Sequence, residues 1–148
     1  GMKVLATRRT PLAKLLRTAD FVTLHCPLTP ETHHLINEKS LRLMKRSASL
    51  LNLARGAVVC EEAVAQALLK NRLCAYATDV LAVEPPLIKH PLFDRRLREK
   101  VLITPHVAWA GRESRQRLVD EIAQNIAKNA KNHSTRLVNV VRSRVALR

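Results

Sequence analysis

The sequence of 148 residues is long enough for one domain with a buried hydrophobic core. Hydrophobic residues make up 47% of it and aromatic residues 3%, a mixture that favours alternating strands and helices over a β-sandwich. No apolar run approaches the roughly 20 residues of a membrane-spanning helix. The first residues do not follow the pattern of a signal peptide. We therefore expect no association with a membrane.

The net charge of +14 is typical of proteins that bind nucleic acid. The basic excess is spread along the chain, with small clusters at Arg8 and Arg9, at residues 95–98 and at residues 142–148. No aromatic residues that could stack on bases lie among these clusters. This distribution favours a solvated surface, and nucleic acid is a less favoured partner.

The three cysteines are Cys26, Cys60 and Cys74, and no two of them have the CxxC spacing. Each lies in or beside an apolar segment. An odd number of cysteines in such positions favours buried free thiols in a reducing compartment. We therefore expect a cytoplasmic protein.

Short apolar runs alternate with amphipathic helical patterns along the whole chain. The runs predict strands at residues 3–7, 21–26, 50–54, 75–80 and 101–104. The helical patterns cover residues 10–17, 38–46, 61–70 and 112–131, with a short polar turn near 95–99. Thr10 and Asn37 are the expected caps of the first two helices, and the last carries Leu118, Ile122, Ile126 and Ala130 at helical spacing. Residues 137–141 are apolar, and the tail after them is basic.

Strands that alternate with helices in this way form βα units around a parallel sheet. The strand at 50–54 is a continuous apolar run, which predicts that both of its faces are buried. The fold class is therefore α/β.

In a parallel sheet all carboxyl ends of the strands lie at the same edge, where open α/β folds bind ligands. Arg55 follows one predicted strand, Asp79 ends another and His106 follows a third, while Glu84 lies on the loop after Asp79. Taken alone, each of these residues could simply be a solvated side chain or a side chain that caps a loop. Their combination at one edge of the sheet favours a site.

The chemistry that fits this combination is the reduction of a 2-oxo acid. Arg55 would hold the substrate carboxylate with two parallel hydrogen bonds and polarise the adjacent carbonyl. Protonated His106 would give its proton to the carbonyl oxygen as a hydride reaches the carbon. Glu84 would accept a hydrogen bond from the other ring nitrogen and so stabilise the imidazolium.

Three ordered motifs carry a specific resemblance. They are residues 52–59 (Asn-Leu-Ala-Arg-Gly-Ala-Val-Val), 79–86 (Asp-Val-Leu-Ala-Val-Glu-Pro-Pro) and 103–109 (Ile-Thr-Pro-His-Val-Ala-Trp). Together they resemble the successive signatures of D-isomer-specific 2-hydroxyacid dehydrogenases, most closely the glycerate dehydrogenase (hydroxypyruvate reductase) branch. Residues 25–32 and Asn37 also match, and the likeness runs from Gly1 to about Val141.

The resemblance implies a Rossmann-type, doubly wound parallel sheet that binds NAD or NADP. Arg55, Glu84 and His106 would take the family's catalytic positions in the roles described above. Ala54, Asp79 and Ala108 would lie along the nicotinamide end of the cofactor, and Pro27 and Thr32 near its adenosine half. No metal ion is implied.

The sequence also departs from the family pattern. The Gly-rich dinucleotide motif should precede Lys3, but the only glycines are Gly1, Gly56 and Gly111. The resemblance therefore implies a partial domain that lacks the first βα unit. We expect residues 1–141 to form this incomplete dinucleotide-binding domain, with a C-terminal helix at 111–132 and a basic tail at 142–148, and we expect no substrate domain. Arg8 and Arg9 stand where many members carry an acid for the ribose, which slightly favours NADP.

The absent unit would be the centre of the sheet, so its loss would leave strand edges with unpaired backbone groups. We therefore expect a homo-oligomer, weak dinucleotide binding and no measurable reduction of substrate by this N-terminally truncated chain. Two alternatives stay open: a non-enzymatic interaction protein on the same scaffold, similar to the family's transcriptional corepressors, and a basic nucleic-acid-binding protein.

Overall fold

A computed structural model describes residues 1–130 of the chain. The chain divides into two compact units, Gly1–Ala108 and Trp109–Arg148, which are described separately. The expected apolar segment at 137–141 and the basic tail at 142–148 lie outside the described residues. No helix among the described residues is long and apolar enough to cross a membrane.

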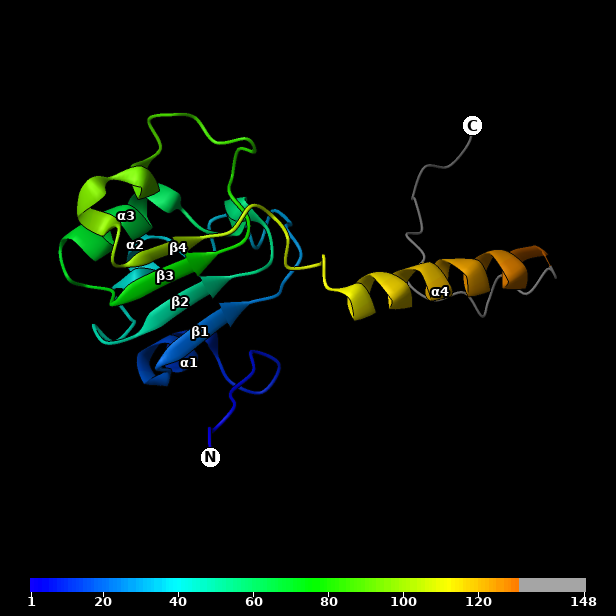
Figure 1. Cartoon of the computed structure of the whole chain (residues 1–148). Coiled ribbons are helices and arrows are strands. Elements are labelled where there is room, and N and C mark those ends of the chain that lie inside the picture. Colours follow the sequence, from blue (N-terminus) through cyan, green and yellow to red (C-terminus); the bar gives the residue numbers. More distant parts are fainter. Residues whose placement is uncertain (131–148) are drawn as a thin grey trace, which may run out of the picture. The chain divides into compact units, whose positions relative to one another are not determined.

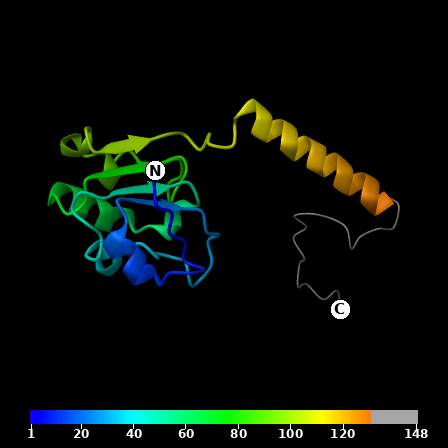
Figure 2. The same ribbon diagram turned by 90° about the horizontal axis from the view of Figure 1, so that it is seen from below.

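The first unit is built on a sheet of four parallel strands, as the alternation of strands and helices predicts. The strands are β1 (Phe21–Leu24), β2 (Ser49–Asn52), β3 (Ala75–Thr78) and β4 (Val101–Ile103). They lie side by side in the order β1-β2-β3-β4 (Figures 1 and 2). The α/β class and four of the five predicted strands are thus confirmed.

The register places the last residues of the four strands in one row. Leu24 lies opposite Asn52, Asn52 opposite Thr78, and Thr78 opposite Ile103. The loops that follow the strands therefore leave from a single edge of the sheet. This edge is where the sequence places Arg55, Asp79 and His106.

One α-helix precedes β1, and two α-helices and three short 3₁₀ turns lie in the connections between the strands. The α-helices are α1 (Leu12–Thr18), α2 (Glu38–Leu41) and α3 (Glu61–Leu69), and the 3₁₀ turns are η1 (Gly56–Val58), η2 (Pro91–Phe93) and η3 (Arg95–Leu97). Asn37 caps α2 as predicted, because its Oδ1 accepts hydrogen bonds from the N–H groups of Lys39 and Ser40. The helix is shorter than the predicted 38–46.

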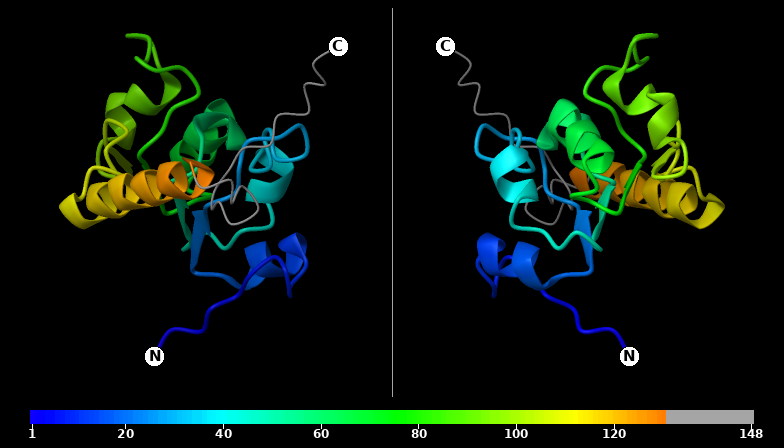
Figure 3. Two further views of the ribbon diagram at one scale, coloured as in Figure 1. Left: turned by 90° about the vertical axis from the view of Figure 1, so that its right-hand side faces the viewer. Right: turned by 90° about the vertical axis from the view of Figure 1, so that its left-hand side faces the viewer.

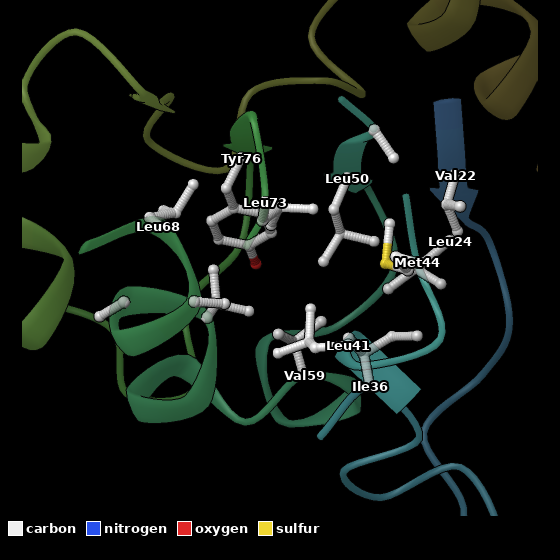
Figure 4. Packing of buried hydrophobic residues seen from close by; sticks show 14 of the residues in the cluster. Val22, Leu24, Ile36, Leu41, Met44, Leu50, Val59, Leu68, Leu73 and Tyr76 are labelled. Atoms are coloured by element: carbon white, nitrogen blue, oxygen red, sulfur yellow. The ribbon is translucent and has the colours of Figure 1, made fainter. Parts of the chain in front are cut away.

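The hydrophobic core of the first unit lies between one face of the sheet and these helices. Leu50 of β2 and Tyr76 of β3 point toward Leu41, Val59 and Leu68 (Figure 4). Two further views show α1, α2 and α3 one after another along the same side of the strands (Figure 3). Burial of these apolar side chains is the main source of stability for the sheet.

The opposite face of the sheet corrects the prediction that the central strand is buried on both sides. Phe21 of β1 and Leu102 of β4 are 67% and 64% exposed, and Leu51 of β2 is only partly buried. The helices of the first unit all pack on the other face, so side chains on this face have no such layer above them. An apolar run in a strand does not by itself tell which of its faces is covered.

The predicted strand at residues 3–7 and the predicted cap of α1 are also wrong. Residues 3–7 form no strand in the described chain, because no other strand lies beside them to receive the ladder of hydrogen bonds that a strand requires. The N-cap of α1 is Pro11, and within the part of the chain that the structure describes no side chain caps this helix. Thr10 instead donates its backbone N–H to Ala6 O across a turn.

All three cysteines are free, but the expected burial of their thiols is wrong. Cys74 is exposed, whereas Cys26 and Cys60 are half-buried. Cys26 packs against the edge of the core, next to the buried Leu24.

The second unit contributes one long helix to the described residues, α4 (Arg112–Ala130). The helix confirms the prediction of a helix over 112–131 as far as Ala130, and residue 131 lies outside the described residues. Leu118, Ile122 and Ile126 lie at helical spacing along it and are 55%, 50% and 65% exposed.

Candidate active site

Arg55 lies on a turn that the buried end of β2 shapes. Asn52, the last residue of that strand, is fully buried. Its side chain accepts a hydrogen bond from the N–H of Ala54 (3.1 Å) and donates one to the carbonyl of Arg55 (3.0 Å). Asn52 therefore holds the turn on both sides of Ala54, while the Arg55 side chain is exposed and donates through Nη1 to the Ala54 carbonyl.

Gly56 brings this turn against the loop that follows β3. A β-carbon on residue 56 would overlap the backbone of Leu81 and Ala82. Only glycine lets two segments of backbone approach so closely. Residue 56 must be glycine because of this contact and not because of its backbone angles, since no glycine in the chain has a positive φ angle.

Glu84 lies on that loop and contacts His106 directly. Its Oε2 is 2.8 Å from Nδ1 of His106, and its Oε1 accepts the N–H of Leu81 (2.8 Å). The two side chains are 38% and 43% exposed. The predicted pairing of these two residues is thus present. The Glu84 carboxylate orients the imidazole and, through Leu81, also stabilises the loop to which it belongs.

Asp79 binds residues on either side of His106. Its carboxylate accepts hydrogen bonds from Thr104 Oγ1 (2.5 Å), Val107 N (2.9 Å) and Ala108 N (2.8 Å). His106 itself has a φ of 54°, in the left-handed region, which costs an L-residue about 1–2 kcal/mol. The bonds to Asp79 compensate for this cost, so a buried carboxylate keeps His106 in a strained conformation of the kind found at functional sites.

The pKa values of the two carboxyl groups reflect these contacts. Burial alone would raise the pKa of Asp79, but the hydrogen bonds from Thr104, Ala108 and Val107 outweigh it, and the pKa is lowered. The pKa of Glu84 is lowered mainly by its hydrogen bond with His106 and next by the N–H of Leu81. Both groups are therefore carboxylates at neutral pH.

The structure brings Glu84 and His106 into contact and brings the Arg55 turn against the same loop through Gly56. The three side chains lie at an open surface. Two hollows at this unit's surface lie elsewhere: one of about 600 Å³ lies beside η2, η3 and β4, and one of about 730 Å³ lies between α2 and α3. Neither is lined by the three predicted catalytic residues.

The predicted cofactor-binding residues fall in three places. Asp79 and Ala108 are bonded to each other at the ends of β3 and β4, and buried Ala54 lies at the end of β2. Thr32 donates its hydroxyl to the Pro27 carbonyl (2.7 Å) in the loop after β1. Arg8 is exposed in a turn before α1.

Three residues with a part in this geometry were not singled out by the sequence reasoning: Asn52, Gly56 and Glu61, of which the last accepts the N–H of Ala82 (3.0 Å). Asn52 is a polar residue inside an apolar run, which is a signal that could have been used. Glu61 lies in the first turn of α3, where the helix dipole already favours an acidic side chain, so its contact with the loop leaves no separate signal in the sequence. The contact at Gly56 joins segments 25 residues apart in sequence and leaves no local signal.

The residues present fit one end of a nicotinamide dinucleotide. A guanidinium and an imidazole at the carboxyl edge of a parallel sheet suit the nicotinamide end and a bound anion. The pyrophosphate of such a cofactor needs a Gly-rich turn at a helix N-terminus. Gly56 does not supply this turn, because the backbone of Leu81 and Ala82 fills the space beside it.

Comparisons with known proteins agree with this geometry. Residues 1–108 match the family model described as "D-isomer specific 2-hydroxyacid dehydrogenase, NAD binding domain". The chain is 43% identical over 132 residues to a glycerate dehydrogenase of Methylorubrum extorquens, an alignment that covers 85% of this chain and 42% of the relative. The chain therefore spans less than half the length of that curated relative.

Solved structures give the same result. The NAD-complexed D-isomer-specific 2-hydroxyacid dehydrogenase of Lactobacillus delbrueckii ssp. bulgaricus superposes with a TM-score of 0.76 at 31% identity, over 87% of this chain and 42% of that one. The family member from Xanthobacter autotrophicus in complex with NADPH and MES also gives 0.76, at 32% identity, over 88% of this chain and 51% of that one. Through its NAD-binding domain, the chain belongs to the D-isomer-specific 2-hydroxyacid dehydrogenase family.

Proposed function

We propose that Arg55, Glu84 and His106 serve hydride transfer between NAD(P)H and a small 2-oxo or 2-hydroxy acid of the hydroxypyruvate and glycerate class. The observation that carries the proposal is the contact of 2.8 Å between His106 Nδ1 and the Glu84 carboxylate, on a loop that packs against the Arg55 turn. An imidazole held in this way by a carboxylate is the usual arrangement of a positioned acid and base.

In this reaction Arg55 binds the substrate carboxylate and polarises the neighbouring carbonyl. NAD(P)H, when bound at this edge of the sheet, would supply the hydride. As the carbonyl carbon becomes tetrahedral, its oxygen takes the proton from Nε2 of His106, and the imidazolium becomes neutral. Glu84 stabilises the imidazolium before this step through Nδ1. Acid catalysis of this kind contributes on the order of 10²–10⁴ in rate.

A titration with oxalate tests the carboxylate site in the isolated chain. Oxalate carries a C–O group next to a carboxylate, as a 2-oxo acid does, but it has no ketone or aldehyde that a hydride could reduce. We expect shifts of the amide signals around Arg55 and Leu81 in NMR spectra, and we expect Arg55→Ala to abolish them. Arg42→Ala is the matched control, since Arg42 is an exposed arginine at the C-terminal end of α2. Oxalate shifts that survive Arg55→Ala would refute the proposed site.

We further propose that the 148-residue chain alone binds dinucleotide weakly and does not sustain turnover. Its three catalytic side chains lie at an open surface, and no Gly-rich turn is available for the pyrophosphate. The check is the absorbance of NADH or NADPH during incubation with hydroxypyruvate. Steady oxidation of either cofactor would contradict the proposed lack of turnover. If that oxidation were lost in His106→Gln, it would still support the proposed role of His106.

The proposed cofactor preference is for NADP, on the grounds of exposed Arg8 and Arg9 before α1. Weaker binding of NADPH by Arg8→Ala, with NADH unchanged, would support it. Arg17→Ala, an exposed arginine in α1, is the control. Equal loss in both variants would point to general charge attraction instead.

The proposed assembly is a homo-oligomer in the cytoplasm. Within the described residues β1 pairs only with β2, so its outer edge offers unpaired backbone groups to another copy. Three free cysteines support a reducing compartment. A monodisperse monomer in light scattering would refute the assembly.

An interaction protein on the same scaffold is the second candidate, and the exposed Phe21 and Leu102 on the sheet favour it. This reading expects no response to oxalate. Nucleic-acid binding through the basic surface is the least favoured, and failure to bind a phosphate column at any salt concentration would dismiss it.

A further inference from the structure

Glu61 and His90 form a buried pair outside the three predicted catalytic residues. His90 Nε2 lies 3.1 Å from Glu61 Oε2, and the two side chains are 9% and 6% exposed. Nδ1 of His90 accepts a hydrogen bond from the N–H of Leu92 (3.3 Å), so Nδ1 is the ring nitrogen that carries no proton. The proton of the neutral ring therefore lies on Nε2 and is donated to Glu61.

The same carboxylate also holds the backbone at the start of the next loop. Glu61 Oε1 accepts the N–H of Ala82 (3.0 Å), while Oε2 receives His90 at the other end of that loop. Residues 82–89 between these two anchors are all exposed. The buried carboxylate of Glu61 is therefore hydrogen-bonded to both ends of an exposed segment.

Glu84 is part of this segment, two residues after Ala82. It binds Leu81 N through Oε1 and His106 through Oε2. The backbone of Gly56 also lies against Leu81 and Ala82. The position of the Glu84 carboxylate relative to His106 therefore depends on how firmly Leu81 and Ala82 are held.

We infer that Glu61 and His90 act as positioning residues: they fix the segment from Leu81 to Glu84, and through it they orient Glu84 toward His106. The inference deepens the proposed function, because it rests on Glu84 and His106 forming the acid–base pair. Neither Glu61 nor His90 touches substrate. Both oxygens of Glu61 and both ring nitrogens of His90 are occupied within the protein.

Two substitutions separate the parts of this arrangement. Glu61→Gln keeps an acceptor for Ala82 but sets an N–H group against the Nε2–H of His90. His90→Asn keeps an acceptor at the position of Nδ1 for Leu92 and removes the link to Glu61. Glu62→Gln is the matched control, because Glu62 is the exposed neighbour in the same helical turn.

Amide hydrogen exchange measured by NMR on the full chain tests the inference. The amide of Leu81 does not touch Glu61 or His90, so its exchange reports on the coupling. We expect it to become about two- to tenfold faster in both variants and to stay unchanged in Glu62→Gln, as for the loss of one hydrogen bond. Exchange at Leu50 in the centre of the sheet is expected to stay the same in all three, since the effect is confined to the loop.

The second readout is the carboxyl titration of Glu84, followed by carbon NMR. Its pKa is lowered by His106 and Leu81, so looser positioning is expected to raise it toward the ordinary value of 4.5. If Leu81 exchange and Glu84 titration in folded His90→Asn both match the parent chain, the inference is overturned, whether or not Glu61→Gln folds. The oxalate titration is independent of this result, so a failure of the proposed function would be recognised separately.

Discussion

The α-carbon of Gly56 lies against the backbone of Leu81 so closely that a β-carbon on residue 56 would overlap the Leu81 carbonyl carbon. This contact joins the turn that carries Arg55 to the loop that carries Glu84. Arg55 and Glu84 therefore lie on two segments that can approach each other only because residue 56 has no side chain.

Gly56→Ala is expected to destabilise the first unit by about 1–3 kcal/mol, as for overpacking of a well-packed interior. The atoms in the way are backbone, so they cannot move aside by changing a rotamer. Urea unfolding followed by circular dichroism measures the change. Gly111→Ala is the control, because a β-carbon there meets only Ser114 Oγ at 3.7 Å, and an unchanged Gly56→Ala midpoint would contradict the contact.

Asp79→Asn is expected to destabilise the loop that carries His106 by about 1–3 kcal/mol. The asparagine amide would present N–H groups where the carboxylate accepts hydrogen bonds from Thr104, Val107 and Ala108. Faster amide exchange at Ala108 and a lower melting temperature are the measurements. The control Asp20→Asn removes an exposed ion pair with Lys45 and is expected to change stability by less than about 1 kcal/mol.

Acid is expected to destabilise the protein as the pH falls below the ordinary pKa values of these carboxyl groups. Asp79 and Glu84 have pKa values below 3.8 and 4.5, respectively, in the folded chain. The unfolded chain takes up protons first, so stability is constant above these ordinary values and is lost as the pH falls through the lower, folded values. Urea midpoints between about pH 7 and about pH 3 measure the effect. Glu84→Gln should flatten this dependence, and an equal slope would contradict the assignment.

Tyr76→Phe is expected to leave the stability unchanged or to raise it slightly. The Tyr76 hydroxyl is buried and makes no hydrogen bond of normal geometry among the described residues. Burial raises the pKa of Tyr76, and the nearby side chains of Thr78 and Asn52 offset this only in part. Removing an unpaired buried hydroxyl relieves a desolvation cost. Thermal unfolding tests this, with Leu50→Ala as a contrast that should cost about 2–5 kcal/mol at the same depth in the core. A large loss of stability in Tyr76→Phe would show that the Tyr76 hydroxyl makes a hydrogen bond in the folded protein.

Much of this architecture could be predicted from the sequence because the relevant signals are local. Apolar runs with polar or proline boundaries marked β1 to β4, and the cap at Asn37 and the periodicity of α4 required only neighbouring residues. Parallel strands end at one edge, so the convergence of Arg55, Asp79 and His106 on one edge followed from the alternation alone.

The rest depended on contacts between distant segments, which no local pattern encodes. Residues 3–7 have the composition of a strand and form none, because a strand exists only beside a partner. Burial of a single face of the sheet was decided by where α1 to α3 pack, and the contact at Gly56 by the meeting of two loops. Local chemistry determined the elements of this protein, whereas tertiary packing decided which strands pair, which face is covered and how a buried carboxylate at Glu61 holds the loop of Glu84.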